Sequence, residues 1–243
     1  MLGAASVPST AAAHCCGDPR IAHSPDSRLS AQRPQGSLQG RSSTSNDAMI
    51  LSALRTATRE QHLRVERAVN LPARLRSRAS FGSLLERFYG YYSPLEERLT
   101  ALARAGQVPF DLQPRLKTTL LRQDLLALGR TPEQIATLPL CTELPSLRET
   151  ADAMGCLYVL EGATLGGQII RQAVSRQLGI EPDSGCAFFH SYGSRTHSQW
   201  SNFCSILADY GDRHPGAESQ VITAATETFA RLGSWIEGQP VTC

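Results

Sequence analysis

The sequence predicts an all-α protein. From residue 49 onward, apolar residues recur at spacings of three and four, which is the period of one face of a helix. Prolines and glycines bound these segments, and no stretch alternates apolar and polar residues as a half-buried strand does. The 243 residues, 41% hydrophobic and 19% charged, are enough for one globular domain and a tail. We therefore expect a single helical bundle over residues 49–243.

Residues 1–48 have a different composition. They are rich in Ser, Ala, Arg, Pro and Gly, contain no Phe, Tyr or Trp, and show neither helical nor strand periodicity. Such a segment buries too little apolar area to offset the entropy of ordering it, so a disordered tail is predicted. Met49 stands directly before the first periodic segment, which indicates an over-extended gene start. An Arg- and Ser-rich transit peptide is the less favoured interpretation.

The helices of the domain are expected in the following order. The first covers residues 50–69, with Leu54 and Thr58 on its apolar stripe, and ends before Pro72. The second follows a capping Ser80 and is kinked at Pro94. The remaining helices are expected at residues 112–128, in a short segment that begins at residue 131, and at residues 146–178. Residues 186–193 then lead into a helix that ends at residue 209, and the last helix covers residues 215–235.

Charge and cysteine content exclude several classes of protein. A net charge of +2 is too small to indicate a nucleic-acid or membrane-surface partner. Almost all basic residues are arginine, with Lys117 the only lysine, a bias typical of a GC-rich genome. The seven cysteines are scattered without a CxxC pair, which favours free thiols in a reducing compartment. No apolar run suggests a membrane span and no secretory signal is visible, so a cytoplasmic location is expected.

The stretch EGATLGGQII (Glu161–Ile170) places Gly162, Gly166 and Gly167 inside the longest predicted helix. Each interior glycine costs about 1 kcal/mol relative to alanine, so their presence needs an explanation. One explanation is close helix–helix packing, and the other is a wide, flat ligand lying against bare backbone. A phosphate-binding loop is less favoured, because the glycines are not at a helix N-terminus.

His62 is the second candidate for chemistry. It lies on or beside the apolar stripe of the first helix, four residues before Glu66. A histidine there is either a packed core residue or a ligand whose tautomer the Glu66 carboxylate fixes. A single axial histidine is enough for haem iron, because the porphyrin supplies four ligands. A flat macrocycle between this helix and the glycine helix would explain both features.

The chain resembles the haem oxygenases. The likeness rests on LRTATREQHLRVE (Leu54–Glu66), LYVLEGATLGGQII (Leu157–Ile170) and CAFFHSYGSRTHSQWSNF (Cys186–Phe203), and it covers nearly all of residues 49–237. It is strongest to the bacterial, biliverdin-producing branch that includes enzymes accompanying bacteriophytochromes. The resemblance implies an all-α, single-domain haem oxygenase-like helical bundle.

The resemblance also implies roles for individual residues. His62 matches the proximal iron ligand, Glu66 the acceptor of its other N–H, and Arg55 a partner of a haem propionate. The glycine helix matches the distal wall, which assigns Gly162, Gly166 and Gly167 to catalysis. Further haem contacts are expected from Tyr158, Tyr192 and Arg195, for which core packing (Tyr158) and an ordinary surface position (Arg195) remain alternatives.

The implied reaction uses haem as both substrate and cofactor and O2 as co-substrate. The products are biliverdin, CO and Fe2+. Because the chain has no GxGxxG fingerprint, electrons are expected from an external ferredoxin or reductase, and a phytochrome is a candidate acceptor of biliverdin.

One departure from the family pattern, at Ala163, and the undecided role of Glu161 keep alternatives open. Ala163 stands where animal members carry an aspartate that anchors the distal waters, so a non-catalytic haem carrier or sensor is the alternative function. A helical protein with another cofactor, or with His62 as a core residue, is a further alternative. Glu161 either contributes to the site or is a solvated or salt-bridged residue that points away from it.

Overall fold

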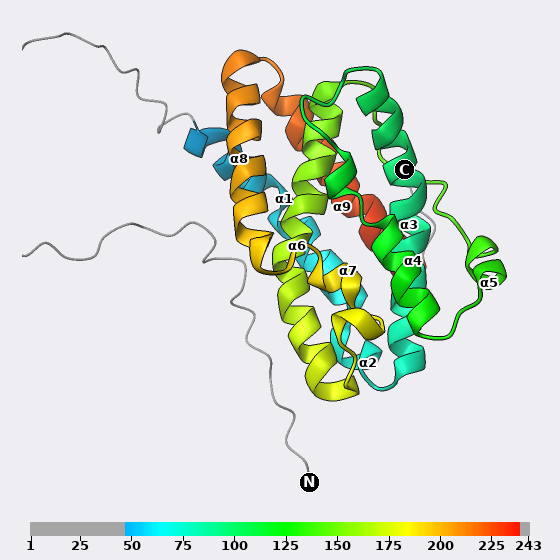
Figure 1. The fold of residues 1–243 in the computed structure, drawn as a ribbon. Coiled ribbons are helices and arrows are strands. Elements are labelled where there is room, and N and C mark those ends of the chain that lie inside the picture. Colours follow the sequence, from blue (N-terminus) through cyan, green and yellow to red (C-terminus); the bar gives the residue numbers. More distant parts are fainter. Residues whose placement is uncertain (1–46, 239–243) are drawn as a thin grey trace, which may run out of the picture. The chain divides into compact units, whose positions relative to one another are not determined.

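The computed structural model describes residues 47–238, and every regular element within them is a helix (Figure 1). The predicted all-α fold is therefore confirmed. The expected tail over 1–48 falls outside the described residues except for its last two, which begin the first helix. The α-helices are α1 (Asp47–Val69), α2 (Leu71–Arg74), α3 (Arg78–Arg104), α4 (Thr118–Ala127), α5 (Pro132–Ala136), α6 (Thr150–Leu178), α7 (Ala187–His190), α8 (Thr196–Arg213) and α9 (Glu218–Glu237). Three short 3-10 helices are η1 (Gln113–Arg115), η2 (Pro182–Ser184) and η3 (Gly193–Arg195).

Helix α3 begins at a different cap from the one predicted. The side chain of Ser77, rather than that of Ser80, caps the helix by accepting a hydrogen bond from the backbone N–H of Ser80. Pro94 lies inside α3, which nevertheless continues to Arg104. A capping oxygen accepts a hydrogen bond from a backbone N–H about three residues further along the chain. Because the cap is Ser77, the helix begins at Arg78, earlier than predicted.

The expected helix over 112–128 is interrupted. Residues Gln113–Arg115 form η1, Leu116 is extended at φ −69° and ψ 138°, and α4 begins only at Thr118. The Glu96 carboxylate of α3 accepts hydrogen bonds from the backbone N–H groups of Lys117 and Thr118, at 2.6 and 2.9 Å. These bonds satisfy orphan donors at the start of α4 and hold η1 in place.

Helix α6 begins at Thr150 rather than at residue 146, because Glu149 and Asp152 form a reciprocal capping box. It ends at Leu178 and is capped by Gly179, whose φ of 60° lies in the left-handed region that glycine adopts easily. By length and composition α6 could cross a membrane, but 56% of its most apolar window is buried inside the bundle. Its hydropathy is therefore typical of a core helix.

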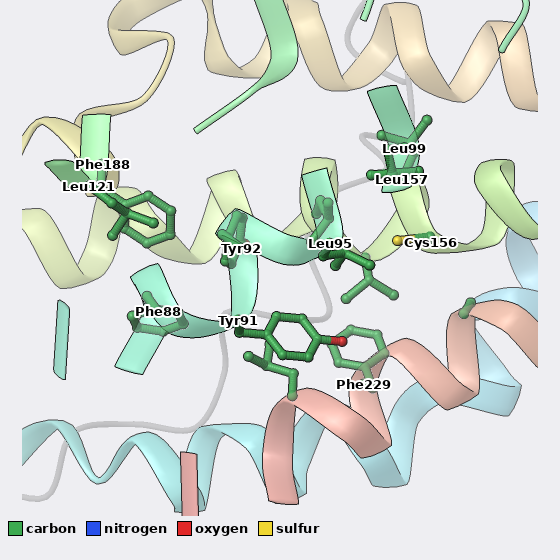
Figure 2. Close-up of a cluster of buried hydrophobic side chains, with 14 of the residues drawn as sticks. Phe88, Tyr91, Tyr92, Leu95, Leu99, Leu121, Cys156, Leu157, Phe188 and Phe229 are labelled. Carbon is green, nitrogen blue, oxygen red and sulfur yellow. The ribbon is translucent and has the colours of Figure 1, made fainter. Parts of the chain in front are cut away.

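The core lies between α3, α6 and α9. Figure 2 shows Tyr91, Tyr92 and Leu95 of α3 beside Cys156 of α6 and Phe229 of α9. The Tyr91 hydroxyl donates 2.9 Å to the Thr228 carbonyl of α9, and burial raises the pKa of Tyr91, so it remains a neutral donor. Each fully buried large apolar side chain contributes roughly 1.5–3 kcal/mol to stability.

Helix α9 packs against both α1 and α6. It lies close to α6 at Gly155, where an added Cβ would lie 2.2 Å from the carbonyl oxygen of Val221. Gly233 of α9 faces α1, where an added Cβ would lie 3.5 Å from Val65. Small residues thus let α9 sit close to the two helices that carry the candidate functional residues.

Candidate functional site

The imidazole of His62 lies on α1 with its ring open to solvent on one side. Its side chain is 42% exposed, and its Nδ1 lies 3.7 Å from Glu66 Oε1, slightly longer than a hydrogen bond. Phe229 of α9 approaches the ring edge-on, with the ring centroids 5.6 Å apart. Nδ1 therefore faces the carboxylate, and Nε2 is the nitrogen left to act as a ligand.

The three candidate glycines of α6 have different surroundings. A Cβ at Gly166 would meet no atom within 4 Å, and one at Gly162 would meet the ring of Trp200 at 3.6 Å. A Cβ at Gly167 would lie 3.1 Å from the carbonyl oxygen of Phe189, so this glycine allows α7 to pack closely. Only Gly162 and Gly166 belong to a surface that is not filled by tight packing.

We call the surface made by Gly162, Ala163, Gly166 and Ile169 the open face of α6. Ala163 and Gly166 are exposed, and Ile169 is 44% exposed although it is a large apolar residue. On α1, Leu63 follows His62 directly and is 40% exposed. Both helices thus present apolar side chains to solvent beside the candidate ligand and the candidate distal wall.

Helices α1 and α6 are held by the same neighbours. Both pack against α8 and α9, while within residues 47–238 they make little direct contact with each other. Ile50 of α1 lies against Gly211 of α8, and Trp200 of α8 lies against Gly162 of α6. The structure therefore places the two predicted motifs on helices with shared supports, as a ligand bound by both would require.

The other predicted haem contacts are spread over three segments. Arg55 is exposed on α1, two turns before His62, and Arg195 is exposed immediately before α8. The half-buried ring of Tyr158 lies 5.6 Å from Trp200. The hydroxyl of Tyr192 donates 2.8 Å to Glu161 Oε1, which already gives it a partner inside the protein. These four assignments remain predictions.

Glu161 is buried and ion-paired, so the salt-bridged alternative describes it. Its side chain is 1% exposed, and its carboxylate lies 2.6 Å from Arg115 Nη1 and 4.0 Å from Lys117 Nζ. Burial lowers the pKa of Lys117 to about 8, while the charges of Glu161 and Glu96 act in the opposite direction. Burial, followed by the Glu161 charge, raises the pKa of Tyr192 above its usual range.

Several residues around the site were not anticipated from the sequence. Trp200 contacts the Gly162 position, Phe229 supports the His62 ring, and Arg115 pairs with Glu161. These are contacts between residues far apart in the chain, for which helical periodicity carries no information. Lys117 did carry a signal, because it is the only lysine among 24 basic residues.

The available donors fit haem better than a bare metal ion. Among the described residues, no three or more His, Cys, Asp or Glu side chains are grouped as metal ligands. His62 offers one accessible imidazole, and a single axial imidazole suits an iron that brings four ligands in its porphyrin. The open face of α6, where an added Cβ at Gly166 meets nothing, leaves room for a flat ring beside the backbone.

Comparison with known proteins identifies the family and the fold. The haem oxygenase family model matches residues 48–238, which include His62 and all three candidate glycines. A solved structure of haem oxygenase 2 from Chlamydomonas reinhardtii without haem is similar, with a TM-score of 0.61 and 19% identity. The similarity covers 79% of this chain and 98% of that one, and at this identity it supports the fold alone. Comparison with curated proteins gives no match. Since the family model spans most of the sequence, the chain belongs to the haem oxygenase family.

Proposed function

We propose that the protein is a haem oxygenase that binds haem between α1 and α6 and cleaves it to biliverdin, CO and Fe2+ with O2 and external electrons. The observation that carries the proposal is that a chain of this family has both an accessible imidazole on α1 and a bare glycine surface on α6. When bound, haem supplies the iron that activates O2 and the ring that is opened.

The residues of α1 would hold the iron side of the ligand. His62 would bind through Nε2, while Glu66, whose Oε1 lies 3.7 Å from Nδ1, is proposed to accept the N–H of Nδ1 and so orient the ring. Phe229 supports the imidazole edge-on and limits its rotation. Arg55, on the same side of α1, is proposed to pair with a propionate, as is Arg195 at the start of α8.

The residues of α6 would form the opposite wall. Gly162 and Gly166 keep side chains away from the ligand, so that the backbone lies close to it and water is excluded. Tyr158 is proposed to contact the ring edge beside Trp200. Gly167 contributes by letting α6 pack on α7, which fixes the helix that carries the other two glycines. Tyr192 is proposed to reach the ligand from the loop before η3.

The proposed partners follow from the reaction. The electrons would come from a ferredoxin or a reductase, and biliverdin would be passed to a phytochrome. We also propose that the protein and these partners are located in the cytoplasm.

A non-catalytic haem carrier or sensor is the second candidate. The observation that favours it is Ala163, an exposed methyl group on the open face of α6 that cannot hydrogen-bond to water. Without a polar side chain there, proton delivery has to rely on backbone groups and on residues outside this face.

The test is an optical titration of the full chain with haemin, followed by a reductant and air. A Soret band that decays into biliverdin absorption is the expected result. A Soret band that persists would support the carrier instead, and the absence of any saturable complex would overturn both candidates.

The ligand assignment is tested with His62→Ala. We expect this variant to keep the helical circular dichroism spectrum and lose the axial nitrogen ligand and most turnover. Added imidazole should restore the spectrum of the haem complex, because it replaces the missing donor. His214→Ala, at the end of α8, is the matched control, and a wild-type spectrum in His62→Ala would show that another residue binds the iron.

A further inference from the structure

Next to Gly162, one buried and one partly buried hydrogen bond join α6 to α8 through Arg115. The Glu161 carboxylate accepts 2.6 Å from one terminal nitrogen of Arg115, and the other terminal nitrogen of Arg115 donates 2.9 Å to Asn202 Oδ1. We call this set, Glu161, Arg115 and Asn202, the Glu161 bridge. The side chain of Arg115 is 7% exposed and that of Glu161 is 1% exposed, so their ion pair is shielded from water, whereas Asn202 lies at the exposed end of the bridge.

The bridge lies where α8 meets the open face of α6. Glu161 directly precedes Gly162, and Asn202 follows Trp200 by two residues. Trp200 is the side chain that a Cβ at Gly162 would meet, and its ring stacks at 6.0 Å on Phe203. The Arg115 guanidinium lies 5.9 Å from the Phe203 ring centroid on one side and 4.9 Å from that of Phe110 on another. Arg115 therefore holds both the backbone at Gly162 and the aromatic residues beside it.

Lys117 and Tyr192 complete the surroundings of Glu161. The Lys117 ammonium donates 2.7 Å to the Arg115 carbonyl and lies 3.9 Å above the Tyr192 ring centroid. The Tyr192 hydroxyl donates to the second oxygen of Glu161. The ammonium is compact, whereas the planar five-donor head of arginine needs more partners than this space provides.

Stability alone does not account for such a group. Replacing a buried ion pair with apolar residues of similar size is often neutral or stabilising, because charged groups are costly to desolvate. What the pair provides is a defined geometry, since hydrogen bonds between charged groups are short and directional.

We propose that the Glu161 bridge is a positioning device that fixes Gly162 against Trp200 and thereby sets the orientation of haem in its site. Glu161, Arg115 and Asn202 act through Gly162 and Trp200 and do not touch the ligand. This inference rests on the proposed function, and it adds three residues that set which edge of the macrocycle is cut.

The first test uses Asn202→Ala, which removes one hydrogen bond without leaving a buried unpaired carboxylate. The background is Trp235→Phe, so that emission comes from Trp200 alone. We expect emission at longer wavelength and stronger quenching by acrylamide in the ligand-free protein. With haem, the mixture of biliverdin isomers should broaden and the dissociation constant should rise by about tenfold. Ser205→Ala, an exposed serine one turn further along α8, is the matched control.

The outcomes separate the two proposals. Unchanged Trp200 emission and an unchanged isomer mixture would overturn the positioning role. Changed emission with an unchanged isomer mixture and affinity would show that the bridge supports only the fold, which also overturns it. If the parent protein binds no haem, the proposed function fails and the orienting role fails with it, while the emission of ligand-free Asn202→Ala still reports whether the bridge holds Trp200.

The second test uses pH. Lys117 faces Glu161 from α6, Glu96 from α3, Arg115 from η1 and the neutral Tyr192. As the pH rises through about 8, the pKa to which burial lowers Lys117, its ammonium loses the charge that supports Glu161. We expect Trp200 emission to change over this range and to stay constant in Lys117→Met. An identical pH profile of Trp200 emission in the two proteins would show that the Lys117 charge does not support the Glu161 bridge.

Discussion

Gly155 and Gly166 lie about three turns apart in the same helix, and their surroundings are opposite. At Gly155 an added Cβ would lie 2.2 Å from the Val221 carbonyl oxygen and 2.8 Å from the Ala224 Cβ. At Gly166 it would meet nothing within 4 Å. The packing of α9 therefore requires the first glycine, whereas no contact inside the described chain requires the second.

The contrast separates two reasons for accepting glycine in a helix. Each interior glycine costs about 1 kcal/mol relative to alanine. Close packing of α6 on α9 offsets this cost at Gly155, because apolar area is buried in return. At Gly166 no such contact exists among residues 47–238, which favours a molecule outside the protein as the explanation. This is the physical argument for a ligand on the open face of α6.

The largest effect is expected for Gly155→Ala. Its methyl group would press on backbone atoms of α9, which cannot move aside as a flexible side chain can. We expect a loss of about 3 kcal/mol in the free energy of unfolding, the upper end for overpacking. Urea denaturation followed by circular dichroism measures it. Gly166→Ala is the matched control and should be about 1 kcal/mol more stable than wild type. Equal stabilities for the two variants would contradict the contrast.

A smaller effect, on binding rather than stability, is expected for Gly166→Leu. The side chain has room in the ligand-free protein, so the free energy of unfolding should not fall. It would project from the open face of α6 into the space assigned to haem, and we expect the haem dissociation constant to rise by about tenfold or more. Haemin titration of the two proteins measures this change. Wild-type affinity in Gly166→Leu would remove the ligand explanation for this glycine.

The sequence was sufficient for the fold, while the roles of the two site motifs stay predictions. Helical periodicity and the Pro and Gly boundaries predicted the main helices, because these signals are local. The sequence was less reliable at helix starts. Ser77 rather than Ser80 caps α3, and α6 begins only after Glu149, which forms a capping box with Asp152. A cap depends on which of several neighbouring side chains turns back to the backbone, and composition does not specify that choice.

Long-range contacts were beyond the sequence. The pairing of Arg115 with Glu161 joins residues 46 positions apart, and Trp200 reaches Gly162 from another helix. No periodic pattern encodes such pairs. Grouping Gly162, Gly166 and Gly167 as one feature was also as far as the sequence could go, because only the structure distinguishes an open position from a packed one.

The smallest change in unfolding free energy is expected for Gly167→Ala, which tests the difference between an open and a packed glycine position. Alanine gains about 1 kcal/mol in helix propensity. Its Cβ, however, would lie 3.1 Å from the Phe189 carbonyl oxygen, which must shift by a few tenths of an ångström. That oxygen also accepts a hydrogen bond of 3.3 Å from the Gln168 side chain, so moving it weakens the attachment of α7 to α6. The two effects nearly cancel, and we expect unfolding free energy to change by less than about 1 kcal/mol. Parallel urea denaturation of Gly166→Ala and Gly167→Ala measures the difference. A gain as large as that of Gly166→Ala would show that α7 yields freely and that Gly167 is not a packing glycine.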